Sequence, residues 1–502
     1  MKIKEIEKKL LAELDEIRAY NHALATLSYD HYTIAPKKAN QEQNETMAIL
    51  SNIVFKKEHS PEFINLLKDA YAVKEKFNPC FKRTIEKLYE DYEKTKNISS
   101  SLAYQIEMDL AKSYDDWLKA KEKSDYNLFI DSFRKVVSYS RQLIDLRDNK
   151  KEIKYDNCLD DYEPNYNIPR MDKFFAELKE GILPLLEKIK KSPKKIRSDF
   201  LHNKVKISKQ EAFSHYILKV IGFDANAGMM STTEHPFTNV LSHHDVRITT
   251  HFYENDFVSN IFTTAHEGGH AIFGQNEPNI LHKYHTNDLM TSAMHECMSR
   301  LYENIVARSK EFIHVIYPRF KRLFKAEFKD VSEEELYEAV NIVTPSLIRT
   351  DSDELTYCLH IIIRYEIEKE LVNGTLEVED AKRVWNEKYK QYLGLDDISD
   401  SEGILQDVHW SGMSFGYFPT YALGNAYSAQ IFHKMNEDFD VKQAIYDGKV
   451  HLVRDWLKKH AFAYASMLDP DEWIIKVTGE PLNTKYYLDY LKDKFAALYD
   501  LK

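Results

Sequence analysis

Apolar residues recur at spacings of three and four positions through most of this chain, which is the pattern of amphipathic helices. The first long example is residues 3–27, IKEIEKKLLAELDEIRAYNHALATL. Residues 83–123 predict a helix, a short polar break and a second helix, and residues 126–148 continue the helical pattern. Turn-forming residues are frequent in YDNCLDDYEPNYNIPRMD, residues 155–172, so we expect a loop there.

One segment has the composition of a strand. Residues 245–253, DVRITTHFY, are rich in Val, Ile, Thr, Phe and Tyr, which favour extended structure. The edge of this strand could pair with an extended peptide. Shortly afterwards, the apolar positions of NIFTTAHEGGHAIFGQ, residues 260–275, predict a helix. Helical patterns then continue to the C-terminus, interrupted by a turn-rich segment at residues 401–421.

Together these elements predict a mainly α fold. We expect one large helical domain over residues 1–502, with a deep cleft between two lobes and a small β element before the helix at 260–275. The scarcity of chain breakers agrees with long helices, because the 502 residues include only 14 glycines and 14 prolines. No internal repeat or convincing linker divides the chain.

Composition argues against several classes of function. A net charge of −11 argues against a nucleic-acid-binding surface. No apolar run approaches the roughly 18 to 20 residues of a membrane span, so we expect no membrane association. The four cysteines form no CxxC pair and are typical of free thiols in a reducing compartment. We therefore expect a soluble cytoplasmic protein.

Two histidines one helical turn apart are the clearest chemical signal. His266 and His270 project from the same face of the helix at 260–275, where neutral imidazoles can hold Zn²⁺ together. Glu267 lies about 100° around the helix from His266, so it flanks the metal without binding it. From there it can act as a general base toward a metal-activated water. This is the HExxH arrangement of metallopeptidases.

A third protein ligand is needed, because catalytic zinc usually has three such ligands and a water. Glu296 is the candidate, since it lies in SAMHECMSRLYENIV, where apolar residues fall at helical spacing. We expect a second helix, antiparallel to the first, whose carboxylate faces the histidine pair. Glu303 is the next candidate in the same segment.

Two glycines lie between the histidines, although each costs about 1 kcal/mol against alanine in a helix interior. Gly269 falls on the other flank of the metal-facing stripe, where a side chain could crowd the ligands or the substrate. The sequence offers no comparable reason for Gly268.

At this point the chain resembles the carboxypeptidase Taq family of metallopeptidases, also called thermostable carboxypeptidase 1-like enzymes. The resemblance is strong from about residue 150 to 430 and rests on several motifs in order. They are YDNCLDDYEP near 155, HPF at 235–237, DVRIT at 245–249, HEGGH at 266–270, HEC at 295–297, IRTDSDELTY at 348–357 and GILQDVHWSGMSFGYFPTYALG at 403–424.

This resemblance implies a helical, cleft-shaped, homodimeric enzyme that removes C-terminal residues from peptides. It implies one divalent metal per chain, usually zinc, with another ion such as Co²⁺ compatible. By position His266, His270 and Glu296 match the ligands and Glu267 matches the general base. The catalytic motifs are concentrated in residues 235–425.

The chain departs from the family pattern at two places. The third motif usually reads His-Glu-Ser, whereas Cys297 replaces the serine here. The N-terminal helix usually carries a Trp-Asp pair, whereas this chain has Tyr29-Asp30. The first departure could alter how the metal ligands are oriented.

A peptidase must also stabilise a developing oxyanion and, if it is a carboxypeptidase, bind a free carboxylate. We expect His409 and Tyr421 to be the oxyanion donors, and Tyr417 beside them is a candidate for substrate binding. A guanidinium matches the two carboxylate oxygens, so Arg349 and Arg247 are the candidates for recognition. The resemblance favours Arg349 for the substrate and Arg247 for a hydrogen-bond network behind the metal helices.

The leading hypothesis is a zinc metallocarboxypeptidase with broad side-chain tolerance. An oligopeptidase of the thimet type is the nearest alternative, because it shares the helical fold and an HExxH motif followed by a distant glutamate. A catalytically inactive peptide-binding relative is the other, and the intact Glu267 argues against it. The sequence leaves open the preferred C-terminal residue, the physiological peptide, the native metal, the effect of Cys297 and the need for a dimer.

Overall fold

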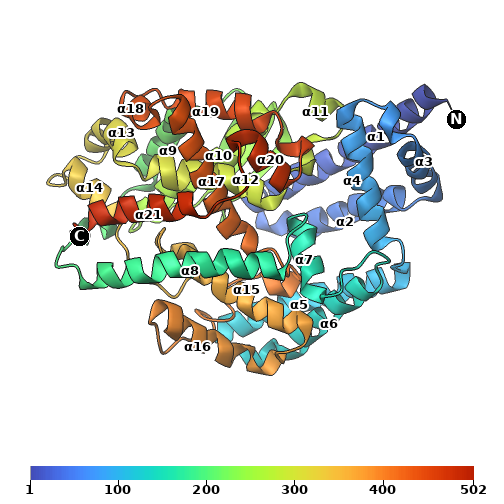
Figure 1. Ribbon diagram of the computed structural model, residues 1–502, viewed down its shortest axis with the longest axis horizontal. Helices are drawn as coiled ribbons and strands as arrows, with labels where there is room; N and C mark the ends of the chain where they lie inside the picture. The colour runs from blue at the N-terminus through green and yellow to red at the C-terminus, as the bar shows by residue number, and fades with distance from the viewer. Residues whose placement is uncertain (1, 502) are drawn as a thin grey trace.

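Helices make up most of the computed structural model, which describes residues 2–501 (Figure 1). The helices before the sheet are α1 (Ile3–Thr33), α2 (Asn40–Glu58), α3 (Pro61–Ala72), α4 (Pro79–Thr95), α5 (Ser100–Lys123), α6 (Ile130–Asp145), α7 (Lys154–Tyr162), α8 (Ile168–Lys191) and α9 (Ile207–Ile221). Those of the middle are α10 (Phe257–Asn276), α11 (Asn279–Lys283), α12 (Ser292–Arg300), α13 (Lys310–Leu323), α14 (Glu333–Val340), α15 (Tyr357–Asn373) and α16 (Ala381–Leu393). The last five are α17 (Pro419–Asp438), α18 (Val441–Tyr446), α19 (His451–Leu457), α20 (Pro470–Thr478) and α21 (Lys485–Leu498).

The mainly helical fold expected from the apolar pattern is confirmed. The pattern at 3–27 lies within α1, and the predicted break in 83–123 separates α4 from α5. The loop expected at 155–172 is confirmed only at 163–167, because α7 covers its first part and α8 its last. Tyr155 and Leu159 lie one helical turn apart and are buried, and this packing outweighs the turn preference of the Asp and Asn residues between them.

A three-stranded sheet lies beside α10. Its strands β1 (Gly228–Thr232), β2 (Thr238–Ser242) and β3 (Asp245–Thr250) have the order β1-β3-β2, with β3 parallel to β1 and antiparallel to β2. The predicted strand is thus confirmed in β3. The open edge expected for it is wrong, because β3 is the central strand and both of its edges are paired.

Two hydrophobic cores hold the helices together. The smaller core consists of residues from α1 to α4 with Leu281 and Tyr284, and these four helices lie together at one end of the molecule (Figure 1). The larger core includes the buried faces of α8, α10, α12, α15 and α17. The helix with the histidine pair therefore belongs to the larger core.

The helices that carry the candidate ligands touch backbone to backbone. A Cβ added at Gly269 of α10 would lie 2.7 Å from the carbonyl oxygen of Met298 in α12. One added at Gly268 would lie 2.5 Å from Ile221 of α9. Both glycines thus permit close helix packing. The expectation for Gly269 needs correction, since the crowding there would come from the α12 backbone.

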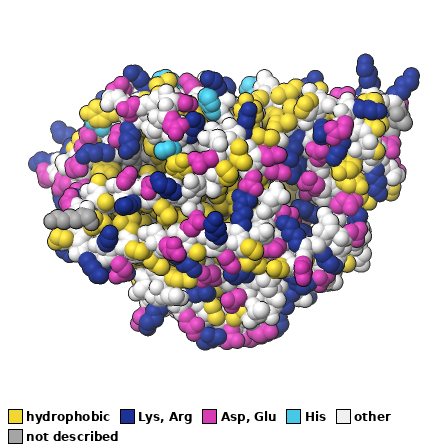
Figure 2. All heavy atoms as spheres, viewed as in Figure 1, with side chains coloured by type: hydrophobic (Ala, Val, Ile, Leu, Met, Phe, Trp, Pro, Cys, Tyr) yellow, Lys and Arg dark blue, Asp and Glu magenta, His cyan; other side chains and the backbone are white. Residues whose placement is uncertain are grey.

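The surface carries charges of both signs. On the face shown in Figure 2, lysine and arginine side chains are interspersed with aspartate and glutamate, and neither sign forms a large separate patch. Within residues 2–501, no helix combines the length and the apolar character required to cross a bilayer.

Candidate metal centre

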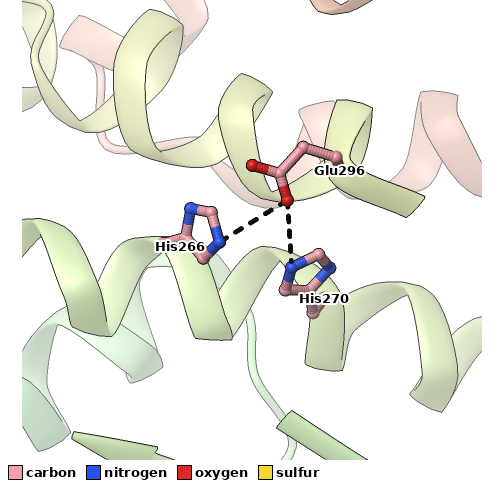
Figure 3. Close-up of side chains that lie close together, drawn as sticks. All are labelled: His266, His270 and Glu296. Carbon is pink, nitrogen blue, oxygen red and sulfur yellow. Dashed lines mark ion pairs between the residues drawn. The ribbon is translucent and has the colours of Figure 1, made fainter. Parts of the chain in front are cut away.

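Three side chains from two facing helices converge on one point. His266 and His270 project from α10 toward Glu296 of α12 (Figure 3). The Glu296 Oε2 atom lies 3.8 Å from His266 Nε2 and 3.6 Å from His270 Nε2. One ligand atom from each residue lies within 4.8 Å of the others, and among the described residues no other such group of His, Cys, Asp or Glu occurs.

Each histidine has a partner on the ring nitrogen that faces away from this point. Nδ1 of His266 lies 2.8 Å from Glu303 Oε2, and Nδ1 of His270 shares a 2.6 Å hydrogen bond with His295. A hydrogen bond at Nδ1 orients the ring and leaves the Nε2 lone pair available. Glu303, which the sequence offered as a second choice of ligand, therefore lies behind His266.

The charges of this cluster are mutually balanced. Burial alone would lower the pKa of His266, but the carboxylates of Glu296 and Glu303 overcome it and raise that pKa to about 9. Arg300 lies between the two acids, with Nε 2.6 Å from Glu296 Oε1 and Nη1 3.2 Å from Glu303 Oε2. Arg300 thus occupies one oxygen of Glu296 and leaves the other facing the histidines.

Glu267 lies beside this cluster and is buried. Its Oε2 atom accepts a 2.6 Å hydrogen bond from the hydroxyl of Thr238 in β2. Burial raises the pKa of Glu267, against the opposing effect of His266 and of the Thr238 hydrogen bond. A carboxylate whose pKa is raised toward neutrality is suited to accept a proton. The sheet therefore contributes directly to the orientation of this residue.

The donor set fits a divalent metal of the zinc type. Two imidazole nitrogens and one carboxylate oxygen are a common protein ligand set of catalytic zinc, with a further position left for water or substrate. His266, whose pKa is about 9, would give up its proton when the metal binds. The partners at Nδ1 of both histidines are those expected around metal-binding imidazoles. The residues present therefore fit the metal that the sequence predicts.

Arg349 is buried and already paired. It lies in the short helix Arg349–Asp351, and its Nη2 and Nε atoms lie 2.8 and 3.1 Å from Oδ1 of Asp407. Its Nη1 atom donates to the hydroxyl of Tyr357 at 3.0 Å. Asp407 also accepts from Arg364 at 2.7 Å, and the two guanidinium groups contribute to a pKa of Asp407 far below its usual range although burial opposes this. Within these three side chains, two guanidinium groups thus face one carboxylate.

The histidine and tyrosines of the 401–421 segment lie together beside Arg349. Tyr421 Oη is 3.4 Å from His409 Nε2, and its ring lies 5.0 Å from the Arg349 guanidinium. The rings of Tyr417 and Tyr421 are 5.3 Å apart, edge to face. Burial lowers the pKa of His409 to about 4, so the ring is neutral near pH 7.

Arg247 lies apart from this group. Its guanidinium pairs with Asp245 at 2.8 Å and lies 5.3 Å from the ring of Tyr29 in α1. Tyr29, where the family pattern has tryptophan, is thus buried against the sheet. Cys297, the other departure, is fully buried in α12.

Several residues of the site were missed by sequence reasoning. Arg300, Thr238, Tyr357 and Asp407 each contact a candidate site residue. Only Arg300 had a usable local signal, because it lies one helical turn after Glu296. The others contact their partners across long sequence separations or from segments whose conformation the pattern did not define.

Comparison with known proteins identifies close relatives over the full length. A family model described as carboxypeptidase Taq (M32) metallopeptidase matches residues 9–495. Carboxypeptidase 1 of Bacillus subtilis is 37% identical over 500 residues, which are 99% of this chain and 100% of that protein. Thermostable carboxypeptidase 1 of Thermus thermophilus is 34% identical over 502 residues, with 97% and 98% covered.

Solved structures agree with these sequence relatives. The M32 carboxypeptidase from Deinococcus radiodurans R1 superposes with a TM-score of 0.95 at 29% identity, covering 99% of this chain and 100% of that one. A structure described as BsuCP has a TM-score of 0.91 at 36% identity, covering 98% and 99%.

Proposed function

This chain belongs to the carboxypeptidase Taq (M32) metallopeptidase family and is a metallocarboxypeptidase, and on that premise we propose how its residues perform the reaction. His266, His270 and Glu296 hold one divalent metal, and zinc is the ion we propose. The observation that supports this assignment is the convergence of their three ligand atoms within 4.8 Å, with Glu267 beside them. Cobalt, which accepts the same ligands, is a workable substitute.

A divalent ion bound there supplies Lewis-acid chemistry, since it polarises the scissile carbonyl and lowers the pKa of a water. Glu267 takes a proton from the attacking water and passes it to the leaving nitrogen. The Thr238 hydroxyl, 2.6 Å from Glu267, holds the carboxylate in place between the two transfers. Arg300 and Glu303 keep Glu296 and His266 in the orientation that metal binding requires.

The substrate is anchored by its C-terminal carboxylate at Arg349. The two guanidinium groups that face the single carboxylate of Asp407 support this role, because a substrate carboxylate can pair with Arg349 beside it. Tyr417 contacts the bound peptide. Arg247 has a structural role as the partner of Asp245 and contributes to the substrate cleft only through the sheet.

His409 and Tyr421 stabilise the oxyanion that develops on the scissile carbonyl. A neutral imidazole and a phenol can each donate one hydrogen bond. Both groups lie beside Arg349, His409 at the start of the short helix His409–Gly412 and Tyr421 in the first turn of α17. Their mutual distance of 3.4 Å allows them to converge on one oxygen atom. Both groups are neutral at pH 7, so neither needs to lose a charge to do this.

We further propose a homodimeric, cytoplasmic enzyme that is one peptidase domain over residues 1–502, with its catalytic motifs in 235–425. The four cysteines, all buried and free, support a reducing compartment. Size-exclusion chromatography with light scattering measures the oligomeric state. Activity measured over a dilution series tests whether the dimer is required.

Neither alternative function is favoured. An oligopeptidase of the thimet type would cut peptides whose C-terminus is amidated, and an inactive relative would bind peptide without turnover. The test is to incubate the zinc-loaded protein with matched free-acid and amidated peptides and to follow the products by mass spectrometry. We expect stepwise loss of single residues from the free-acid peptides. Internal cleavage of the amides, or bound zinc without turnover, would contradict the proposal.

A further inference from the structure

The helix that carries Glu296 has no cap of its own. Its N-cap residue is Thr291, whose side chain accepts no hydrogen bond from the first turn of α12. The Ala293 N–H group instead donates to Oε1 of Glu163 at 2.7 Å, and the Thr291 hydroxyl donates to Oε2 of the same residue at 2.9 Å. One carboxylate from elsewhere in the chain therefore satisfies the start of this helix.

Glu163 is itself buried and held in place by hydrogen bonds, so it can constrain the start of α12. It belongs to the turn between α7 and α8, 130 residues before Ala293 in the sequence, and only 2% of it is exposed. Its own N–H donates to Leu159 at 2.8 Å, and its carbonyl accepts from Tyr166 at 3.1 Å. The hydroxyl of Tyr166 in turn lies 2.9 Å from that of Tyr427 in α17. The turn is thus tied to the same core on which α12 rests.

The sides of α12 are already constrained, so its end decides where Glu296 lies. On one side α12 meets the α10 backbone at Gly269, and on the other Glu296 itself lies against α17, where a Cβ at Gly424 would come within 2.8 Å of Glu296 Cγ. A helix held between two such surfaces can still slide along its axis or rotate. Ala293 lies one turn before Glu296, so holding Ala293 limits both motions at the carboxylate.

We propose that Glu163 is a positioning residue for the metal ligand Glu296, and that its two hydrogen bonds to the start of α12 set the affinity of the site for its divalent metal. This inference rests on the ligand role proposed above for Glu296. Glu163 of the YDNCLDDYEP motif would thus influence metal binding through the position of α12.

The test compares three substitutions at Glu163 with a matched control. Glu163→Ala removes both hydrogen bonds. Glu163→Gln keeps them, because its amide oxygen can accept from Ala293 and its amide NH₂ can donate to the Thr291 hydroxyl oxygen. Asp400 is the control, since it is a buried carboxylate (8% exposed) that accepts a 2.8 Å hydrogen bond from the backbone N–H of Tyr126 and pairs with Lys382, not with a residue of the metal centre. The third variant, Glu163→Asp, shortens the side chain and keeps the carboxyl group.

The readouts are zinc affinity by chelator competition, the visible spectrum of the cobalt-loaded protein, and the melting temperature of the metal-free protein. We expect Glu163→Ala to weaken zinc binding about ten- to a hundredfold, as losses of partners behind metal ligands do, and to change the cobalt spectrum. The zinc affinity of Glu163→Gln should stay within about threefold of that of wild type. The zinc affinity of Glu163→Asp should fall between those of Glu163→Ala and Glu163→Gln. Asp400→Ala should lower the melting temperature and leave zinc affinity unchanged.

Three results would overturn the proposal. The first is a Glu163→Ala protein with a lower melting temperature but unchanged zinc affinity and cobalt spectrum, which would make Glu163 merely structural. The second is an Asp400→Ala protein that loses as much zinc affinity. The third result applies if Glu163→Ala fails to fold. Thr291→Ala, which removes one of the two hydrogen bonds, would then replace it, and an unchanged zinc affinity of Thr291→Ala would overturn the proposal. Unchanged zinc affinity in Glu296→Ala would instead remove the ligand assignment, so the two failures are distinguishable.

Discussion

At the metal centre the three candidate ligands come from two adjacent helices, whereas Arg349, Asp407 and Tyr421 come from three separate segments of the chain. His266 and His270 share α10, and Glu296 follows on α12. Arg349, Asp407 and Tyr421 meet only because a short helix, a loop and the start of α17 are packed together. The first region depends on helical spacing and the second on tertiary structure.

The two regions also differ in how their charges are satisfied before any substrate binds. At the metal centre, Oε2 of Glu296 faces the Nε2 atoms of His266 and His270 at 3.8 and 3.6 Å. At Arg349 the guanidinium already has Asp407 and Tyr357 as partners. The three ligand atoms of the metal centre thus face one common point, whereas a substrate carboxylate at Arg349 would share the guanidinium with Asp407 and Tyr357.

The largest effect should come from Glu267, because it tests chemistry at the metal centre with no change in recognition. We expect Glu267→Gln to keep the metal and the free-acid preference and to lose about 10²- to 10⁴-fold in kcat. Its amide oxygen can still accept from Thr238, so the local structure is preserved. Metal content by mass spectrometry and steady-state kinetics check this. A metal-loaded variant with a near-normal rate would remove Glu267 from the role of base.

The second-largest effect concerns the proposed oxyanion donors, which lie beside Arg349 but act on the reaction at the metal centre. His409→Ala and Tyr421→Phe should each lower kcat about 10²- to 10³-fold with little change in KM, because an oxyanion donor acts in the transition state. Tyr417→Phe is the matched control, since its ring lies 5.3 Å from that of Tyr421 and its proposed contact is with the bound peptide. It should change KM more than kcat. If all three variants show the same pattern in KM alone, none of these groups is an oxyanion donor.

A smaller effect should be confined to recognition. In Arg349→Met, the ratio of kcat/KM for a free-acid peptide to that for its amide should fall about ten- to a hundredfold, the usual value of a charge-assisted hydrogen bond. Asp407 keeps Arg364 as a partner, so the variant does not strand a buried charge.

Arg247→Met is the control for that substitution. Arg247 pairs with Asp245, so its loss should leave the ratio unchanged. A ratio that falls only in Arg247→Met would mean that the two arginines have been assigned the wrong way round. A ratio unchanged in both variants would mean that neither arginine sets the exopeptidase direction.

The smallest effect concerns how the Arg349 region is held. Glu368 accepts from Trp410 at 2.7 Å and from Gly416 at 2.9 Å, so it anchors the loop that carries His409. Burial raises the pKa of Glu368 from 4.5 to about 7 in the folded protein. Its protonated form therefore favours folding, with a contribution that is complete below pH 4.5 and lost as the pH rises through 7.

Glu368→Gln cannot ionise, so it removes this dependence on pH. It should be less stable overall, because an amide cannot accept from every donor that Glu368 serves. The loss of stability between pH 5 and pH 8 should nevertheless be smaller than in wild type. Melting temperatures of both proteins across this range, with the metal removed, provide the measurement, and parallel curves would contradict the shift.

The contrast between the regions explains what could be read from the sequence. A spacing of four residues predicted that His266 and His270 share a face, because helical geometry is local. The same logic placed Glu296 on a helix that faces them, and the structure brings the three together. The mainly helical fold followed from the same periodicity, because the hydrogen bonds of a helix join residues that are close in sequence.

What the sequence did not reveal depends on packing between distant segments. The partnership of Arg349 with Asp407 and that of Thr238 with Glu267 leave no periodic trace. The central position of β3 requires β1 and β2, whose side chains are mostly half-buried and lack a clean alternation. The reason for Gly268 lies in Ile221 of α9, which no local pattern could indicate.

The glycines on both sides of α12 have a consequence for ion selectivity. Gly269 and Gly424 bring two neighbouring helices against the segment that carries Glu296, at hypothetical Cβ distances of 2.7 and 2.8 Å. A cavity whose wall cannot retreat cannot expand to suit a larger ion, and fixed ligand spacing is one way in which proteins discriminate by ionic radius. The centre should therefore accept zinc and cobalt, which are similar in size, and disfavour cadmium, with the same nitrogen and oxygen ligands in each case.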